Sequence, residues 1–65
     1  MTDTRKLKAA MLEAGYTQKK LAVQLGISVY TLYKKLHNLT EFKASEVKAI
    51  TSILALPDKD AIFFN

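Results

Sequence analysis

The sequence predicts an all-α protein, a compact bundle of four to five short helices in one domain over residues 1–65. Apolar residues recur at spacings of three and four, and no stretch alternates apolar and polar side chains as a strand would. Only two glycines and one proline interrupt the chain, and 49% of its residues are hydrophobic. A chain of 65 residues is near the lower size limit for a protein that forms a hydrophobic core without disulfides or a structural metal. It has no cysteine, which excludes disulfides and thiolate metal sites.

The first helix is expected over residues 4–14. Leu7, Met11 and Ala14 follow one another at spacings of four and three, the pattern of an amphipathic helix. Gly15 is a typical C-terminal stop for it.

The next two helices are predicted over residues 18–24 and 29–37. Thr17 and Ser28 precede them and can cap them, because a hydroxyl accepts a hydrogen bond from an unpaired backbone N–H of the first turn. Gly26 ends the earlier of the two, since glycine adopts the left-handed conformation without strain. The core positions expected in this segment are Leu21, Ala22, Leu25, Ile27, Leu32 and Leu36.

A fourth helix is predicted over residues 44–54 and one last short turn over residues 57–64. Val47, Ile50 and Leu54 share one face of the fourth helix, while Lys43 offers no clean cap. Asn38, in the loop before it, suits a left-handed turn. The final Ile62-Phe63-Phe64 segment is expected either in the core or in a contact between subunits, because exposed terminal hydrophobic residues are unfavourable.

The positive charge is concentrated in one segment. The net charge is +4, yet the residues outside 17–38 carry six basic and six acidic side chains. Residues 17–38 contain four lysines and no acidic residue. A localised basic patch is typical of a protein that binds a polyanion. Lysines that serve only solubility are the alternative.

Residues 17–37 have the organisation of a helix-turn-helix motif, two short helices joined by a turn that contains glycine. The 3.6-residue period places one set of side chains of the second helix opposite Leu32 and Leu36. An apolar and aromatic face gains nothing from water, but it can contact thymine methyl groups and base edges in a major groove. The side chains of this face are Val29, Tyr30, Tyr33, Lys34 and His37.

The run "YTQKKLAVQLGISVYTLYKKLHN" resembles the helix-turn-helix of small phage repressors and Cro-like regulators, the XRE family. The segments "TEF..SE" and "IFF" resemble one short phage-encoded subgroup. The resemblance covers residues 7–64 and implies a lambda-repressor-like DNA-binding fold. The chain departs from the family in two ways, with Asn38 where glycine is common and with Val29 and Tyr30 where glutamine or arginine is frequent. Because Val29 and Tyr30 differ from the usual base-reading residues, the resemblance does not predict which operator sequence the protein would bind.

The resemblance also implies roles for individual residues. Val29, Tyr30 and Lys34 match base-reading positions, and Tyr33 shares their face. Contacts with the DNA backbone are implied for Thr17, Gln18, Ser28, Thr31 and His37. Their positive charge makes Lys19, Lys35 and Lys43 expected neighbours of DNA phosphates.

Roles that do not involve DNA remain open for several of these side chains. Val29, Tyr30 and Tyr33 could contact another protein chain, and Tyr33 could pack on the first helix. His37 could be a surface or capping residue, and Gln18 a polar residue at a helix start.

These features predict a sequence-specific regulator that binds double-stranded operator DNA as a homodimer and represses by occluding a promoter. A phage or prophage Cro-like repressor in the cytoplasm of a bacterial host is the expectation, with no cofactor, metal, membrane partner or small-molecule effector. The alternative is a protein-interaction module, such as an antirepressor that binds another regulator. An enzyme is not expected, because no nucleophile with a base, no facing carboxylates and no phosphate-binding glycine loop occur.

Overall fold

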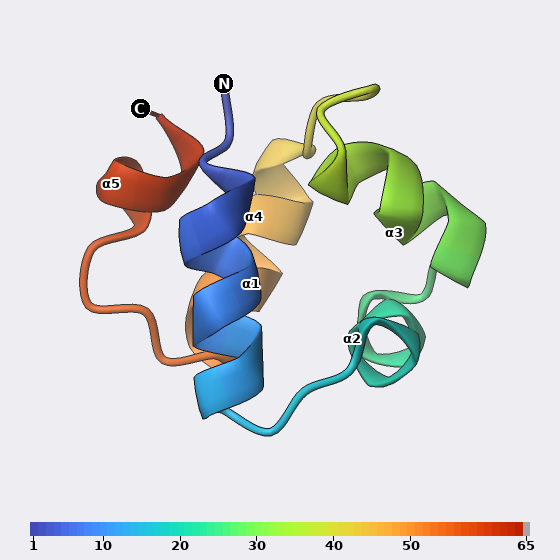
Figure 1. Ribbon diagram of the computed structural model, residues 1–65, viewed down its shortest axis with the longest axis horizontal. Helices are drawn as coiled ribbons and strands as arrows, with labels where there is room; N and C mark the ends of the chain where they lie inside the picture. Colours follow the sequence, from blue (N-terminus) through green and yellow to red (C-terminus); the bar gives the residue numbers. More distant parts are fainter. Residues whose placement is uncertain (65) are drawn as a thin grey trace.

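The computed structural model describes residues 1–64 and shows five helices and no strand in that part of the chain. The all-α prediction is confirmed, and the ends of the first four helices agree with the predicted ones to within one residue. The predicted terminal turn is a short fifth helix (Figure 1). The helices are α1 (Thr4–Glu13), α2 (Gln18–Leu25), α3 (Val29–Leu36), α4 (Ala44–Ile53) and α5 (Lys59–Phe63).

Four of the five helices begin with a side-chain cap. In each, an oxygen of the capping side chain accepts a hydrogen bond from the backbone N–H three residues further on. Each such cap stabilises a helix by about 1 kcal/mol. The predicted caps at Thr17 and Ser28 are confirmed. The four capping residues are Asp3, Thr17, Ser28 and Asp58.

The core lies where the inner faces of the helices meet, and its largest side chains are fully buried. Full burial of one such side chain contributes about 1.5–3 kcal/mol. Phe63 of α5 packs edge-on against Phe42, with ring centroids 5.5 Å apart, so part of the terminal segment belongs to the core. The fully buried large residues are Leu7, Leu21, Leu32, Leu36 and Ile50.

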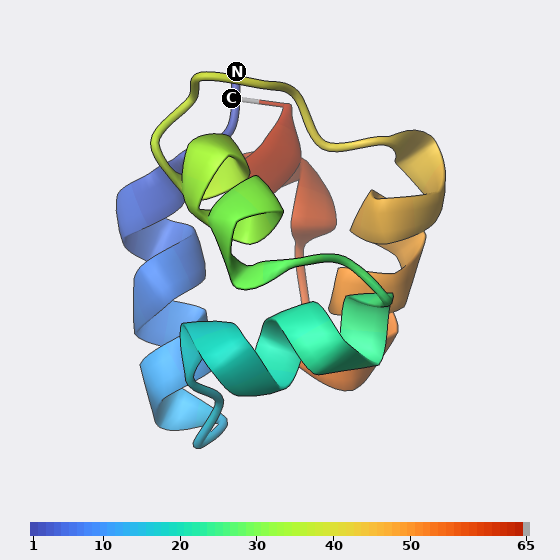
Figure 2. The same cartoon turned by 90° about the vertical axis from the view of Figure 1, so that its right-hand side faces the viewer.

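The turn between α2 and α3 orients the second helix. Gly26 adopts the left-handed conformation with φ of 70°, as predicted, and Ile27 packs against the core. Asn38 is also left-handed, with φ of 58°, and ends α3 as the sequence suggested. Because α2 and α3 pack against each other, they form one side of the molecule, with α5 behind them (Figure 2).

The two ends of the described chain are joined on another side. The backbone N–H of Asp3 donates a hydrogen bond of 2.6 Å to the carbonyl oxygen of Ile62, and α1 packs against α5 (Figure 1). Among residues 1–64, no helix has the length and apolar character that a membrane crossing requires.

Candidate nucleic-acid interface

The outer face of α3 is exposed as the helical period predicted. Leu32 and Leu36 on its inner face have no exposed surface. On the outer face, Val29 is 45% exposed, Tyr30 68% and Tyr33 44%. Three large apolar or aromatic side chains therefore stand in solvent on one short helix. They contribute little to the core of a monomer.

The aromatic rings of α3 form a row along this face. The rings of Tyr30 and Tyr33 are nearly parallel, with an interplanar angle of 12° and centroids 6.3 Å apart. The ring of His37 follows, 4.1 Å from that of Tyr33. Tyr33 is 44% exposed, so it is not a core residue of the monomer. His37 is exposed and forms the C-cap of α3, where its backbone N–H donates to the carbonyl of Tyr33.

One lysine side chain contacts this row, and two further lysines are exposed on the neighbouring helix α2. The Lys34 ammonium lies 5.1 Å from the centroid of the Tyr30 ring, an attractive cation–π distance. Lys19 and Lys20 are exposed on α2, and the Lys20 ammonium lies 4.7 Å from the Tyr16 ring centroid. Lys20 was not among the predicted backbone contacts. Lys20 could have been predicted as a DNA-backbone contact, because it belongs to the segment 17–38, which contains no acidic residue.

Lys35 does not lie on this face, contrary to the prediction that it neighbours a phosphate. Its side chain is 7% exposed, and its ammonium is 3.1 Å from Oε1 of Glu46. The same ammonium donates a 2.9 Å hydrogen bond to the carbonyl of Glu41. Lys35 is a buried structural residue because position 35 comes three residues after Leu32 and therefore falls on the core side of α3.

The predicted hydroxyl contacts lie at the helix starts. Thr17 Oγ1 accepts from the Lys20 backbone N–H at 3.1 Å, as the cap of α2. Ser28 Oγ accepts from the Thr31 backbone N–H and donates to Thr31 Oγ1 at 2.8 Å. Thr31 therefore keeps its own hydroxyl proton available to donate to a phosphate oxygen.

Two further predicted residues differ in their placement. Gln18 is half-buried at the start of α2 and lines a shallow surface hollow with Val29, Tyr30 and Tyr33. Lys43 is exposed at the start of α4 and thus belongs to a different element from the face of α3. Its backbone N–H donates a 2.7 Å hydrogen bond to Glu46 Oε1, which begins α4 without a hydroxyl cap.

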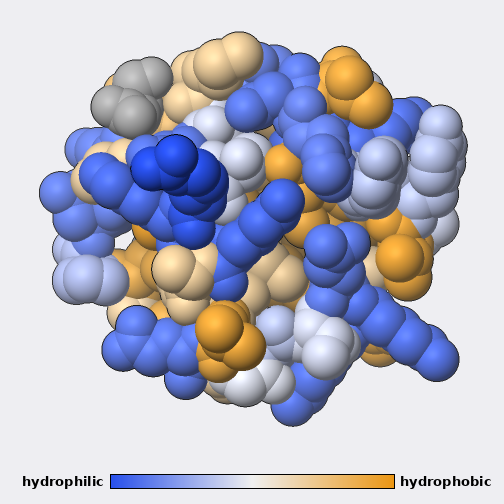
Figure 3. Space-filling view, viewed as in Figure 1, coloured by the Kyte–Doolittle hydropathy of each residue, from blue (hydrophilic) through white to orange (hydrophobic). Residues whose placement is uncertain are grey.

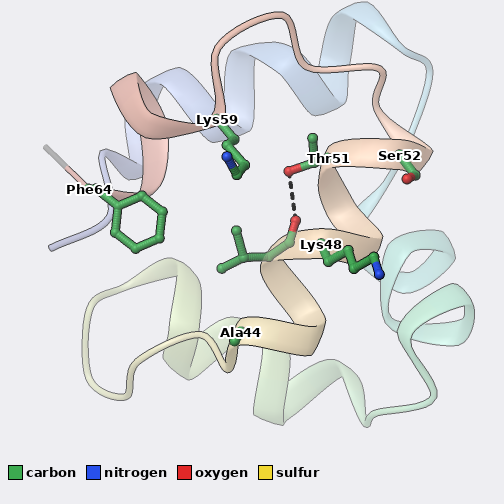
Figure 4. Close-up of a pocket in the computed structure, with 7 residues that line it drawn as sticks. Ala44, Lys48, Thr51, Ser52, Lys59 and Phe64 are labelled. Carbon is green, nitrogen blue, oxygen red and sulfur yellow. Dashed lines mark hydrogen bonds between the residues drawn. The ribbon is translucent and has the colours of Figure 1, made fainter.

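A second surface feature is an apolar groove between α4 and α5, which the sequence reading did not identify (Figure 4). Phe64 is 66% exposed at one side of it, although its neighbours Ile62 and Phe63 are buried. Ala44 and Thr51 of α4 lie on the other side (Figure 4), and Val47, Lys48, Ser52 and Lys59 complete the lining.

In the view of Figure 3, hydrophobic residues appear in several separate places between hydrophilic ones. Within residues 1–64, no group of three His, Cys, Asp or Glu side chains is placed to hold a metal ion.

Comparison with known proteins identifies the motif. Residues 7–39, just over half of the chain, match the family described as the helix-turn-helix domain of resolvase. The match covers most of α1 and all of α2 and α3, and therefore includes the whole exposed face described above. The match gives the resolvase type as the family. It supports the predicted helix-turn-helix DNA-binding domain but does not specify the phage repressors that the sequence resembles. Neither the curated proteins nor the solved structures that were searched gave a match.

Proposed function

Because this chain belongs to the family of resolvase-type helix-turn-helix domains, we propose that it binds double-stranded DNA in a sequence-specific manner through α3. We further propose that it regulates transcription as a repressor that occludes a promoter, in the manner of the small phage Cro-like regulators that its sequence resembles. Residues 1–65 act in this proposal as a single DNA-binding unit in a bacterial cytoplasm, on a phage or prophage operator.

The observation that supports this proposal most strongly is the exposed face of α3. A helix fits the major groove, where apolar groups meet thymine methyls and donors meet guanine and adenine edges. Val29 and Tyr30 present apolar surface there, and the Lys34 ammonium supplies a donor beside them. Lys19 and Lys20 on α2 then lie near the phosphates, which fixes the position of α3 without reading sequence.

The size of the molecule supports binding as a homodimer. α3 has eight residues, about 12 Å at 1.5 Å per residue, which spans three to four base pairs. The longest extent of the molecule is 25 Å, less than the 34–36 Å of one DNA turn, the usual half-site spacing. One copy therefore reads a short half-site, and two copies on a near-palindromic operator double the number of contacts.

We assign the subunit contact to the groove between α4 and α5. In this contact the grooves of two copies face each other. The exposed Phe64 ring of each copy packs against Ala44 and Val47 of the other. A two-fold contact of this kind is self-complementary, as dimers of identical chains require. It leaves α3 uncovered, because α5 and α3 lie at opposite sides of the molecule (Figure 1).

Selection of binding sites from random duplexes, followed by affinity measurement over a range of salt concentrations, tests the DNA proposal. The logarithm of the affinity is expected to fall with the logarithm of salt concentration, with a slope of about −0.9 per neutralised phosphate. Lys19→Ala is expected to make the slope shallower by about 0.9, whereas the control Lys8→Ala, at an exposed position of α1 outside both the basic segment and the groove, leaves it unchanged. A flat salt dependence with no enriched sequence contradicts DNA binding and favours the protein-interaction module.

A further inference from the structure

The hollow at the start of the α2–α3 face has an unusual lining for a surface that meets base pairs. It is open to solvent, and Gln18 of α2 and Val29, Tyr30 and Tyr33 of α3 surround it. Most of its exposed lining is apolar. The side-chain amide of Gln18 and the hydroxyls at the tips of the tyrosine rings are the only hydrogen-bonding groups of these four side chains.

The major-groove edges of the bases differ in what they offer to such a surface. Guanine, adenine and cytosine present acceptors and donors, which lose hydrogen bonds to water when they face apolar atoms. Thymine alone presents a methyl group, at C5. A hollow walled by Val29 and by the rings of Tyr30 and Tyr33 therefore favours thymine over each of the other bases.

The walls of the hollow are held by neighbouring side chains. The ring of Tyr33 lies between those of Tyr30 and His37, and the Lys34 ammonium sits over the Tyr30 ring. These attractive contacts favour the ring positions that line the hollow. The apolar walls are thus present before DNA binds, which reduces the entropy that ordering would cost.

We propose that this hollow receives the C5 methyl groups of thymine in each half-site, so that the protein selects its operator largely by apolar contacts. The inference rests on the proposed DNA-binding function and specifies which chemistry provides the specificity. Lys34 adds one contact in which an ammonium group donates a hydrogen bond to a base edge. Its Cα is about 7.5 Å along the helix axis from that of Val29, at 1.5 Å per residue, which places the two contacts about two base pairs apart.

The test compares the selected operator duplex with duplexes in which one thymine of the half-site at a time is replaced by uracil. Uracil keeps the base pairing and lacks only the methyl group. At the thymine that enters the hollow, the affinity is expected to fall about fourfold, the equivalent of about 0.8 kcal/mol per buried methyl-sized group. Replacement of a thymine outside the half-sites is the matched control and is expected to change nothing.

The Val29→Ala variant links the effect to the hollow. It removes part of one wall and is expected to bind the thymine and uracil duplexes with affinities that differ by less than twofold, while the salt dependence stays that of the wild type. Equal wild-type affinity for the thymine duplex and every uracil duplex overturns the inference but leaves sequence-specific binding in place. Absence of any preferred duplex overturns the proposed function and this inference together.

Discussion

Replacement of Lys35 by methionine removes a buried charge without removing the apolar stem that carries it. The Lys35 ammonium is 3.1 Å from Glu46 Oε1, and the side chains are 7% and 10% exposed. It also donates to the carbonyl of Glu41 and lies 5.8 Å from the Phe42 ring centroid. These contacts join the end of α3 to the start of α4 across the intervening loop. We therefore expect the variant to fold less stably.

The loss of stability in Lys35→Met depends on the contacts that the Glu46 carboxylate retains. In Lys35→Met, Glu46 retains the Lys43 N–H at 2.7 Å but loses its only ion-pair partner among the described residues. Removal of one partner of a buried pair costs about 3–5 kcal/mol, and the retained hydrogen bond favours the lower end. A loss of about 3 kcal/mol lowers the melting temperature of a domain of this size by about 12–24 °C. That is a large part of the total stability expected for such a domain, about 3–10 kcal/mol.

Urea unfolding followed by far-UV circular dichroism measures this loss. The double variant Lys35→Met/Glu46→Gln is expected to recover at least about 1 kcal/mol, because neutral glutamine still accepts from the Lys43 N–H and leaves no unpaired buried charge. Lys34→Met, one position earlier, is the control and is expected to cost at most about 1 kcal/mol. A cost below about 1 kcal/mol for Lys35→Met, with no recovery in the double variant, refutes the reasoning about the buried pair.

Three further outcomes are expected. Lys34→Ala relaxes discrimination at one or two operator positions by about 1–3 kcal/mol in binding measured on single-base variants of the operator; a uniform loss on all sequences would instead make Lys34 a phosphate contact. Gly26→Ala destabilises the fold by about 1–2 kcal/mol in urea unfolding, from backbone strain alone, because a Cβ there meets no atom within 4 Å; Gly26→Asn, which tolerates this conformation, should cost less. Phe64→Ser weakens self-association in sedimentation without lowering the melting temperature, whereas the buried Phe63→Ser lowers it; an unchanged sedimentation profile in Phe64→Ser contradicts the proposed subunit contact.

Much of the fold could be predicted because local signals and tertiary packing agree. Thr17, Gly26 and Ser28 stand where backbone groups need a cap or a left-handed turn, and the structure uses all three. The period of the apolar residues gave the inner stripe of α3, and with it the exposed Val29 and Tyr30. These features depend on a few consecutive residues, which is why they can be read from sequence.

What could not be predicted depends on residues distant in the sequence. A count of charges treats Lys35 as one more surface lysine, and only the approach of α4 supplies the carboxylate that makes its burial favourable. The position of Lys35 between Leu32 and Leu36 on the helical period was a signal, but a polar residue there carries no indication of its partner. The groove likewise requires α5 to fold back beside α4, which separates the exposed Phe64 from the buried Phe63.

The two sides of α3 therefore have separate roles, and this separation supports the proposed function. Leu32, Lys35 and Leu36 attach the helix to the core, and their replacement is expected to change stability first. Val29 and Tyr30 on the opposite side make no comparable contribution to the core, and the exposure of so much apolar surface is unfavourable in water. A surface with that cost is accounted for when a partner covers it. The basic, acid-free segment that carries it makes DNA the partner that best matches both its charge and its shape.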